Sequence, residues 1–398
     1  MDVLNFIKQQ ARELLPELIE IRRHLHRYPE LSMQEAQTSA YIQSRLAAIG
    51  IPFQAGMAQH GVVGLIEGQN PDARIIALRA DMDALQITEE NRVPYCSANQ
   101  GVMHACGHDV HMTCLLGASL ILNRIKDLFE GSIKLIFQPS EEKFPGGASM
   151  MIAEGVLENP RPEKIFAQHV LPTLDAGKVG FRAGKYMASA DEVYLTVKGI
   201  GGHGATPELI VDPVLIAAHI LVALQQIVSR KVPPQLPAVL SFGRFIADGQ
   251  TNVIPNEVKL AGTLRTFDEV WRTETHRNIT QMAQQIAESM GGKCEVFIDK
   301  GYPFLINDEE VTQKSKQAAI DYLGAENVVD LDLRMTAEDF AYYSQQMPSC
   351  FYRLGVRNEA KNIIHNLHTP YFDVEESSLE TGAGLMAWLA IKALEDFN

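Results

Sequence analysis

The chain has 398 residues, a formal net charge of −14 and a sequence pI near 5.3. This length suggests about two domains, and 46% hydrophobic with 21% charged residues is typical of a soluble globular protein rather than a disordered one. The acidic balance argues against a nucleic-acid partner, because phosphate binding needs clustered Lys and Arg.

The sequence carries no pattern of export or membrane insertion. Residues 1–26 are amphipathic and lack the basic start, the unbroken apolar run and the cleavage site of a secretory signal. The longest apolar stretches, 214–224 and 384–394, are too short to span a bilayer. The five cysteines are odd in number and scattered, which favours free thiols in a reducing compartment. We therefore expect a cytoplasmic protein without a membrane partner.

Strands and helices are expected to alternate along the first part of the chain, after two helices at 2–27 and 34–48. Apolar, β-branched runs predict strands at 74–80, 132–137 and 164–170, and helical patterns lie at 148–157 and at 110–125, with Asp109 as the N-cap. This alternation is typical of an α/β fold with a mixed, mostly parallel sheet and helices on both faces.

Residues 187–300 follow a different pattern, β-α-β-β-α-β, which predicts a compact four-stranded ferredoxin-like sheet backed by two helices. Helical patterns resume after this segment, with a short strand near 349–355. We therefore expect an inserted domain at 187–300 between the two parts of a larger domain, 1–186 and 301–398.

Polar side chains follow the carboxyl ends of three predicted strands, where ligand sites of open α/β sheets lie. They are Asp81 and Asp83 after 74–80, Glu141 and Glu142 after 132–137, and His169 after 164–168. The stretch 102–113 adds Cys106 and His108, which are two residues apart and in a loop can both point to one place. We expect all these side chains to converge.

A thiolate, imidazoles and carboxylates together suit divalent ions such as Zn²⁺, Mn²⁺, Co²⁺ or Ni²⁺. Glu141 and Glu142 are adjacent, and neighbouring side chains of an extended backbone point to opposite sides. One of them is therefore expected to be a ligand and the other a free base. A carboxylate base beside a metal is what metal-assisted hydrolysis requires.

Each of these residues also has a purely structural interpretation. A single cysteine such as Cys106 is usually buried packing, a single histidine at a strand end is more often structural, and adjacent glutamates are commonly solvated. We expect His104 and His111 to support the site or the packing rather than to bind metal. The remaining cysteines and histidines are expected to be structural and without partners: Cys96, Cys114, Cys294, Cys350, His24, His26, His60, His219 and His276.

Eight motifs follow one another as in a known enzyme family. They are "LRADMDAL" (78–85), "HACGHDVHM" (104–112), "FQPSEE" (137–142), "QHV" (168–170), "GGHGATP" (201–207), "TNVIP" (251–255), "AEDFAYY" (337–343) and "LHTPYFDVEE" (367–376). The chain resembles, nearly end to end, the N-acyl-amino-acid amidohydrolases. These are dinuclear metallopeptidase relatives that include hippurate hydrolase, auxin-conjugate hydrolases and acetyl-diaminopimelate deacetylase.

The resemblance implies a catalytic domain that binds two divalent ions (Mn, Zn, Ni or Co) and an inserted lid or dimerisation domain. By position, Glu141 resembles the general base and Asp83 the aspartate that orients a neighbouring ligand. Asp81 stands where more distant relatives have a ligating histidine. The metal ligands implied by the resemblance are Cys106 as the bridge, His108, Glu142, His169 and His368.

The resemblance also assigns residues of the insert. His203 resembles the histidine that polarises the scissile carbonyl, often from the partner subunit of a dimer, and Asn252 resembles a substrate-positioning residue. Glu338 lies in a motif near the site, without an assigned role. Relatives often have histidine after the proline of "GAxPH", whereas Glu208 follows Pro207 here, which bears on substrate or lid contacts. A homodimer or higher homo-oligomer is expected.

The predicted function is hydrolysis of N-acyl amino acids, such as N-acetyl or N-benzoyl derivatives, to a carboxylate and a free amino acid. A metallo-dipeptidase or carboxypeptidase with the same metal chemistry is the alternative. Two further hypotheses are a non-catalytic metal-carrying protein and an enzyme with Cys106 as the nucleophile. The metal hypothesis requires the Cys106 sulfur to lie within ~6 Å of the His368 imidazole.

Overall fold

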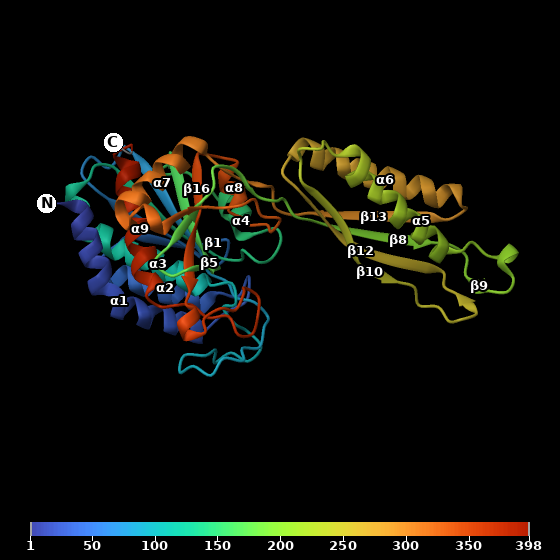
Figure 1. Ribbon diagram of the computed structural model, residues 1–398, viewed down its shortest axis with the longest axis horizontal. Coiled ribbons are helices and arrows are strands. Elements are labelled where there is room, and N and C mark those ends of the chain that lie inside the picture. Colours follow the sequence, from blue (N-terminus) through green and yellow to red (C-terminus); the bar gives the residue numbers. More distant parts are fainter. Residues whose placement is uncertain (1, 397–398) are drawn as a thin grey trace. The chain divides into compact units, whose positions relative to one another are not determined.

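The computed structural model describes residues 2–396, which form two compact units (Figure 1). The first unit comprises 2–186, Ile306–Leu333 and 339–396, and the second comprises Met187–Leu305 and Arg334–Glu338. The segment predicted as an insert, 187–300, lies inside the second unit. That unit also takes in residues 301–305 and five residues that precede Asp339.

The first unit is built on an eight-stranded sheet with the order β1-β2-β4-β3-β5-β16-β6-β15. Its centre, β4-β3-β5-β16, is parallel, and antiparallel strands join it on either side. The predicted mixed, mostly parallel sheet is confirmed. Its strands are β1 (Phe53–Met57), β2 (Gly61–Glu67), β3 (Ile75–Asp81), β4 (Ser132–Gln138), β5 (Lys164–Asp175), β6 (Val179–Phe181), β15 (Val328–Asp330) and β16 (Ser349–Arg357).

Helices pack against this sheet and against one another. Helices α3 and α9 contact each other and β3, α1 lies against both, and α4 and α8 contact β4 and β16 respectively. Because α3 lies between the sheet and two helices, nearly all of its side chains are buried, the polar His108, Asp109 and His111 included. The helices are α1 (Val3–Arg27), α2 (Ala36–Ala48), α3 (His108–Arg124), α4 (Gly147–Ala153), α7 (Glu309–Leu323), α8 (Ala341–Ser344) and α9 (Ser378–Leu394).

Helix α3 begins earlier than its sequence pattern predicts. Its first residue is His108, and the preceding residue is Gly107, whose φ of 82° only glycine adopts without strain. Asp109 is therefore not the N-cap. The Asp109 side chain is fully buried. The apolar pattern of the sequence did not indicate that this charged residue would be buried.

The second unit has the predicted β-α-β-β-α-β order, with an antiparallel sheet β10-β12-β8-β13. Helices α5 and α6 contact each other and pack on this sheet. Ile216, Ile220 and Ile279 are fully buried between the layers. The elements are β8 (Asp191–Lys198), β9 (Gly202–His203), α5 (Pro213–Gln226), β10 (Ala238–Ile246), β11 (Val253–Ile254), β12 (Glu257–Thr266), α6 (Glu269–Ser289) and β13 (Lys293–Lys300), with β7 (Gly184–Met187) and β14 (Leu305–Asn307) bordering it.

Helix α5 is longer than the apolar stretch 214–224 indicates, because a π-turn, Ile227–Lys231, continues it. Among the described residues, this 19-residue helix is long and apolar enough to cross a membrane by length and composition. The apolar stretch 214–224 forms only part of this helix and is by itself too short to span a bilayer. In the fold, one face of the helix packs on the four-stranded sheet through buried side chains that include Ile216 and Leu224, while Leu215 and Val222 are exposed.

Candidate metal centre

The parallel strands bring the polar residues predicted at their ends to one edge of the sheet. Asp81 is the last residue of β3 and lies opposite Gln138, the last residue of β4. On the other side of β3, Arg79 lies opposite Ala167 of β5, so that His169 is level with Asp81. Strand β5 continues to Asp175 rather than ending near 170, and His169 therefore lies within the strand.

Two groups of metal-ligand side chains share the Cys106 sulfur. In the first group, Cys106 Sγ lies 3.4 Å from His169 Nε2, and His108 is the third member. In the second, Cys106 Sγ lies 3.4 Å from His368 Nε2, which in turn lies 3.5 Å from Glu142 Oε1. The Cys106 to His368 distance is thus well within the ~6 Å limit that the metal hypothesis sets.

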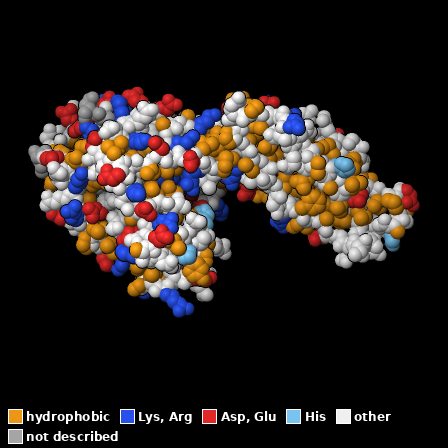
Figure 2. All heavy atoms as spheres, viewed as in Figure 1, with side chains coloured by type: hydrophobic (Ala, Val, Ile, Leu, Met, Phe, Trp, Pro, Cys, Tyr) orange, Lys and Arg blue, Asp and Glu red, His pale blue; other side chains and the backbone are white. Residues whose placement is uncertain are grey.

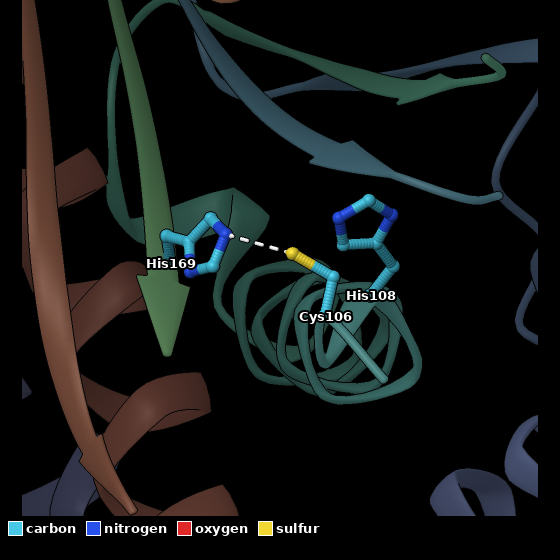
Figure 3. Close-up of side chains that lie close together, drawn as sticks. All are labelled: Cys106, His108 and His169. Atoms are coloured by element: carbon cyan, nitrogen blue, oxygen red, sulfur yellow. Dashed lines mark hydrogen bonds between the residues drawn. The ribbon is translucent and has the colours of Figure 1, made fainter. Parts of the chain in front are cut away.

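The close-up in Figure 3 shows how the first group is assembled. Cys106 and His108 stand at the start of α3, and the sulfur points to the imidazole of His169 on β5. His108 is in the first turn of the helix rather than in a loop. The two side chains nevertheless face the same region, with the left-handed Gly107 between them.

The donor atoms of this centre fit a divalent cation. His108 Nε2 and Glu142 Oε1 are buried and have no hydrogen-bond partner among the described residues, although buried polar atoms are almost always paired. The two atoms lie 3.9 Å apart, so a cation between them would satisfy both. Thiolate, imidazole and carboxylate donors are those that Zn²⁺, Mn²⁺, Co²⁺ and Ni²⁺ accept.

The charges around the centre also favour a cation. Burial alone would lower the pKa of His108, but the neighbouring carboxylates of Asp81, Asp83 and Glu142 raise it to about 10. Burial, together with Glu142 and Glu141, raises the pKa of the Cys106 thiol well above its usual value. The raised pKa of His108 indicates an excess of negative charge around its imidazole, which a bound cation would compensate.

Hydrogen bonds fix the histidine rings on β5 and α3. His169 Nδ1 donates to the Val170 carbonyl at 2.8 Å, which leaves Nε2 unprotonated and facing Cys106. The Val170 N–H donates to His111 Nε2 at 3.0 Å, so His111 Nδ1 carries the proton and donates to Asp81 at 2.6 Å. Such partners orient the ligands of metal sites. His111 and Asp81 are thus hydrogen-bonded to each other next to His108, with which they form a further group of closely spaced donor atoms.

The turn that carries Glu141 and Glu142 is held from two sides. The backbone N–H groups of both glutamates donate to Asp83, at 2.9 and 3.0 Å. Ser140, with a left-handed φ of 57°, donates its N–H to the buried Glu35 carboxylate at 2.7 Å. Burial and the charge of Asp83 raise the pKa of Glu35 to about 7. These contacts determine where the two glutamates point.

Glu141 itself is a buried carboxylate beside the donor groups. It is 6% exposed, and together with His108 and Glu142 it forms a further set of closely spaced oxygen and nitrogen atoms. The Asp339 N–H donates to Glu141 Oε1 at 3.3 Å. Asp83 lies 3.3 Å from His108 Nδ1 through Oδ1, which is the position of a residue that orients this histidine.

The residues predicted from the insert lie together in the second unit. His203 in β9 pairs with Val253 of β11, and Gly204 donates its N–H to the Asn252 carbonyl at 2.9 Å. Both His203 and Asn252 are exposed on this two-stranded ribbon. Glu338 is buried, within the five residues that precede Asp339 in the second unit.

Several buried polar residues were missed by the sequence analysis. Arg22 and Asp109 form a fully buried ion pair at 2.8 Å, and Glu35 supports the Ser140 turn. Two histidines expected to have no partner have one: His26 contacts Asp109 at 2.8 Å, and His276 contacts Asp191 at 2.7 Å. The sequence signal that could have indicated a buried ion pair is a charged residue on the apolar face of a helix, and Arg22 on α1 is such a residue.

Comparisons with known proteins identify the family of this chain. The profile of peptidase family M20/M25/M40 matches residues 77–392. An N-acyl-L-amino acid amidohydrolase of Geobacillus stearothermophilus is 40% identical over 304 residues, 76% of this chain and 81% of the relative. Thermostable carboxypeptidase 1 of Saccharolobus solfataricus is 36% identical over 395 residues, 98% of this chain and 99% of the relative.

A solved structure extends the likeness to the fold. The Bacillus subtilis YXEP protein, a dinuclear metal binding peptidase of the M20 family, matches with a TM-score of 0.82 at 32% identity, covering 96% of this chain and 99% of that one. The fold and the matched profile define a metallopeptidase-type hydrolase, and the chain belongs to peptidase family M20/M25/M40. The predicted resemblance and the predicted enzyme class, hydrolysis of amide bonds, are confirmed.

Proposed function

We propose that this protein is a metal-dependent amidohydrolase that cleaves N-acyl amino acids to a carboxylate and a free amino acid. The observation that carries the proposal is the Cys106 sulfur, which lies 3.4 Å from both His169 and His368 beside the buried carboxylate of Glu141. The substrate class is supported by the name of the Geobacillus relative, an N-acyl-L-amino acid amidohydrolase.

The donor groups divide into two sets that share one residue, which supports a pair of divalent ions bridged by the Cys106 thiolate. His108 and His169 would complete one set, and Glu142 and His368 the other. Asp83 would orient His108. The YXEP protein, a dinuclear metal binding peptidase, supports the number of ions, and the donor types suit Mn²⁺, Zn²⁺, Ni²⁺ or Co²⁺.

Bound divalent ions supply Lewis-acid activation of water and of the amide carbonyl. Glu141 takes the proton from the attacking water and then gives it to the leaving amine. Its burial and the Asp339 N–H at 3.3 Å hold the carboxylate in one place. Glu142 forms a group with Cys106 and His368, whereas no group contains both Glu141 and Cys106, which supports Glu142 as the ligand and Glu141 as the base.

The second unit is proposed to complete the catalytic machinery and to form a homodimer. His203 would polarise the scissile carbonyl and Asn252 would position the substrate; their exposure on one ribbon supports a role in binding.

Hydrophobic side chains gather on the surface of this unit (Figure 2), and Leu215 and Val222 of α5 are 52% and 74% exposed. Such side chains mark interaction surfaces. We place the enzyme in the cytoplasm.

Glu141→Gln tests the proposed base. The amide is nearly the same size and cannot accept a proton, so kcat with N-acetyl amino acids should fall by about 10²–10⁴-fold, while both metal ions stay bound. The measurements are steady-state kinetics and metal analysis of the same sample. A variant that hydrolyses these substrates at a near wild-type rate would show that Glu141 is not the base.

Carboxypeptidase activity is the second candidate, because thermostable carboxypeptidase 1 is 36% identical over nearly the whole chain. The same metal chemistry would serve both reactions, and only the recognised substrate differs. A panel of N-acyl amino acids against unblocked dipeptides and longer peptides separates them. A higher kcat/KM for unblocked peptides would favour the carboxypeptidase.

A further inference from the structure

Arg22 is a fully buried cation on α1, far in sequence from the donor groups. Its Nε donates to Asp109 Oδ2 at 2.8 Å, and its Nη2 donates to Asp373 Oδ1 at 2.9 Å. Asp109 is fully buried as well, and the Asp373 side chain is 15% exposed. One guanidinium therefore joins two segments that are 264 positions apart in the sequence.

Both partners of Arg22 stand next to metal-ligand residues. Asp109 directly follows His108 in the first turn of α3, and Asp373 lies five positions after His368 in the same loop. A shift of Asp109 moves the backbone of His108, and a shift of Asp373 moves the loop that carries His368. Arg22 thus connects the start of α3, which carries His108, to the loop that carries His368. Both of these histidines lie near Cys106.

The Asp373 side of this contact is reinforced by Tyr95. The Tyr95 hydroxyl donates to Asp373 Oδ2 at 2.8 Å, and the Arg22 guanidinium lies over the Tyr95 ring, 5.0 Å from its centroid. A cation over an aromatic ring is attracted to it. We call Arg22, Asp109, Asp373 and Tyr95 the Arg22 cluster.

His368 depends on such support more than the other donors. Its side chain is 54% exposed, whereas that of His108 is fully buried. Its backbone has a left-handed φ of 60°, and its N–H donates to the Ala105 carbonyl at 2.9 Å. An exposed imidazole on a strained backbone needs neighbours that hold its loop.

We propose that Arg22 is a positioning residue of the dinuclear centre, which acts through Asp109 and Asp373 to hold His368 against the Cys106 side of the site. The inference rests on the proposed function, because it assigns His368 to one of the two ions. It concerns binding of that ion rather than the chemical step.

Asp373→Ala tests the inference, because removing Arg22 itself would leave Asp109 buried without its partner and endanger the fold. The metal-free full-length variant is titrated with Co²⁺, whose affinity and number of bound ions are measured together with the sulfur-to-cobalt absorption. We expect the first ion to bind as in the wild type, with its thiolate signal. The second ion should bind about 10–100-fold more weakly, as when an outer-shell partner is lost.

Two variants serve as controls in the same titration. Arg12 lies on α1 like Arg22, and Arg12→Ala breaks its surface pair with Glu380 of α9, at 3.7 Å; this variant should bind both ions normally. His368→Ala should bind one ion. If His368→Ala loses an ion and Asp373→Ala binds both as tightly as the wild type, the inference is wrong and the proposed ligands stand. If His368→Ala still binds two ions tightly, the proposed ligand set fails and the inference with it.

Discussion

Burial raises the pKa of the Cys106 thiol, and metal binding at this residue should therefore depend on pH. The pKa of this thiol is raised by burial and by Glu142 and Glu141, and that of His108 is raised to about 10. In the metal-free protein both groups therefore hold a proton at neutral pH. A ligand must give up its proton before it binds metal, so filling the centre with metal displaces protons into solution.

Metal affinity is consequently expected to rise with pH and to fall as pH is lowered through the neutral range. For each displaced proton the dissociation constant should change about tenfold per pH unit. Isothermal titration of the metal-free protein with Zn²⁺ or Mn²⁺, at several pH values and in buffers of different ionisation enthalpy, counts the released protons. A dissociation constant that does not vary between pH 6 and 8 would contradict the protonation of both donors.

The candidate site residues could be predicted from the sequence, whereas several buried residues that hold them in place could not. Cys106, His108 and Glu142 stand in short motifs whose spacing shows in the sequence. Arg22 bonds to a residue 87 positions away, and Glu35 to one 105 positions away. Without a local pattern, such pairings emerge only when the tertiary fold brings the partners together.

At the scale of elements, the start of α3 determines where Cys106 and His108 point. Gly107 separates them with a φ of 82°, and a Cβ at this position would lie 2.5 Å from Val170 Cγ2. Val170 in turn holds both His169 and His111 through its backbone. Position 107 thus needs glycine both for its left-handed backbone and for the space beside Val170 of β5.

Gly107→Ala should therefore destabilise the protein and weaken metal binding together. The left-handed backbone alone costs about 1–2 kcal/mol for a non-glycine residue, and the contact with Val170 adds to it. Denaturant unfolding of the metal-free variant measures the loss. Gly155→Ala is the matched control, since its φ is 87° and no atom lies within 4 Å of the added Cβ. Equal losses in the two variants would show that the Val170 contact has no effect.

Element types were predicted better than element boundaries. The β-α-β-β-α-β order of the second unit followed from alternating strand and helix patterns, because each element buries one face. The helix start at His108 was missed because Gly107 was taken as part of a longer loop. The extension of α5 to Lys231 was missed because the apolar stretch ends before the π-turn.

At the scale of the whole molecule, the two units have separate hydrophobic cores and carry different predicted residues. The first holds all five candidate metal ligands, and the second holds His203 and Asn252. The family profile spans residues from both units. We therefore propose that the first unit binds the metal ions and that the second contributes to substrate recognition.

The central claim is that one thiolate bridges two divalent ions. Anomalous diffraction from crystals grown with Zn²⁺ tests it most directly. We predict two metal peaks roughly 3.5–4 Å apart, each about 2.3 Å from the Cys106 sulfur, one next to His169 and the other next to His368. A single peak, or two peaks of which only one contacts Cys106, would contradict the bridged pair.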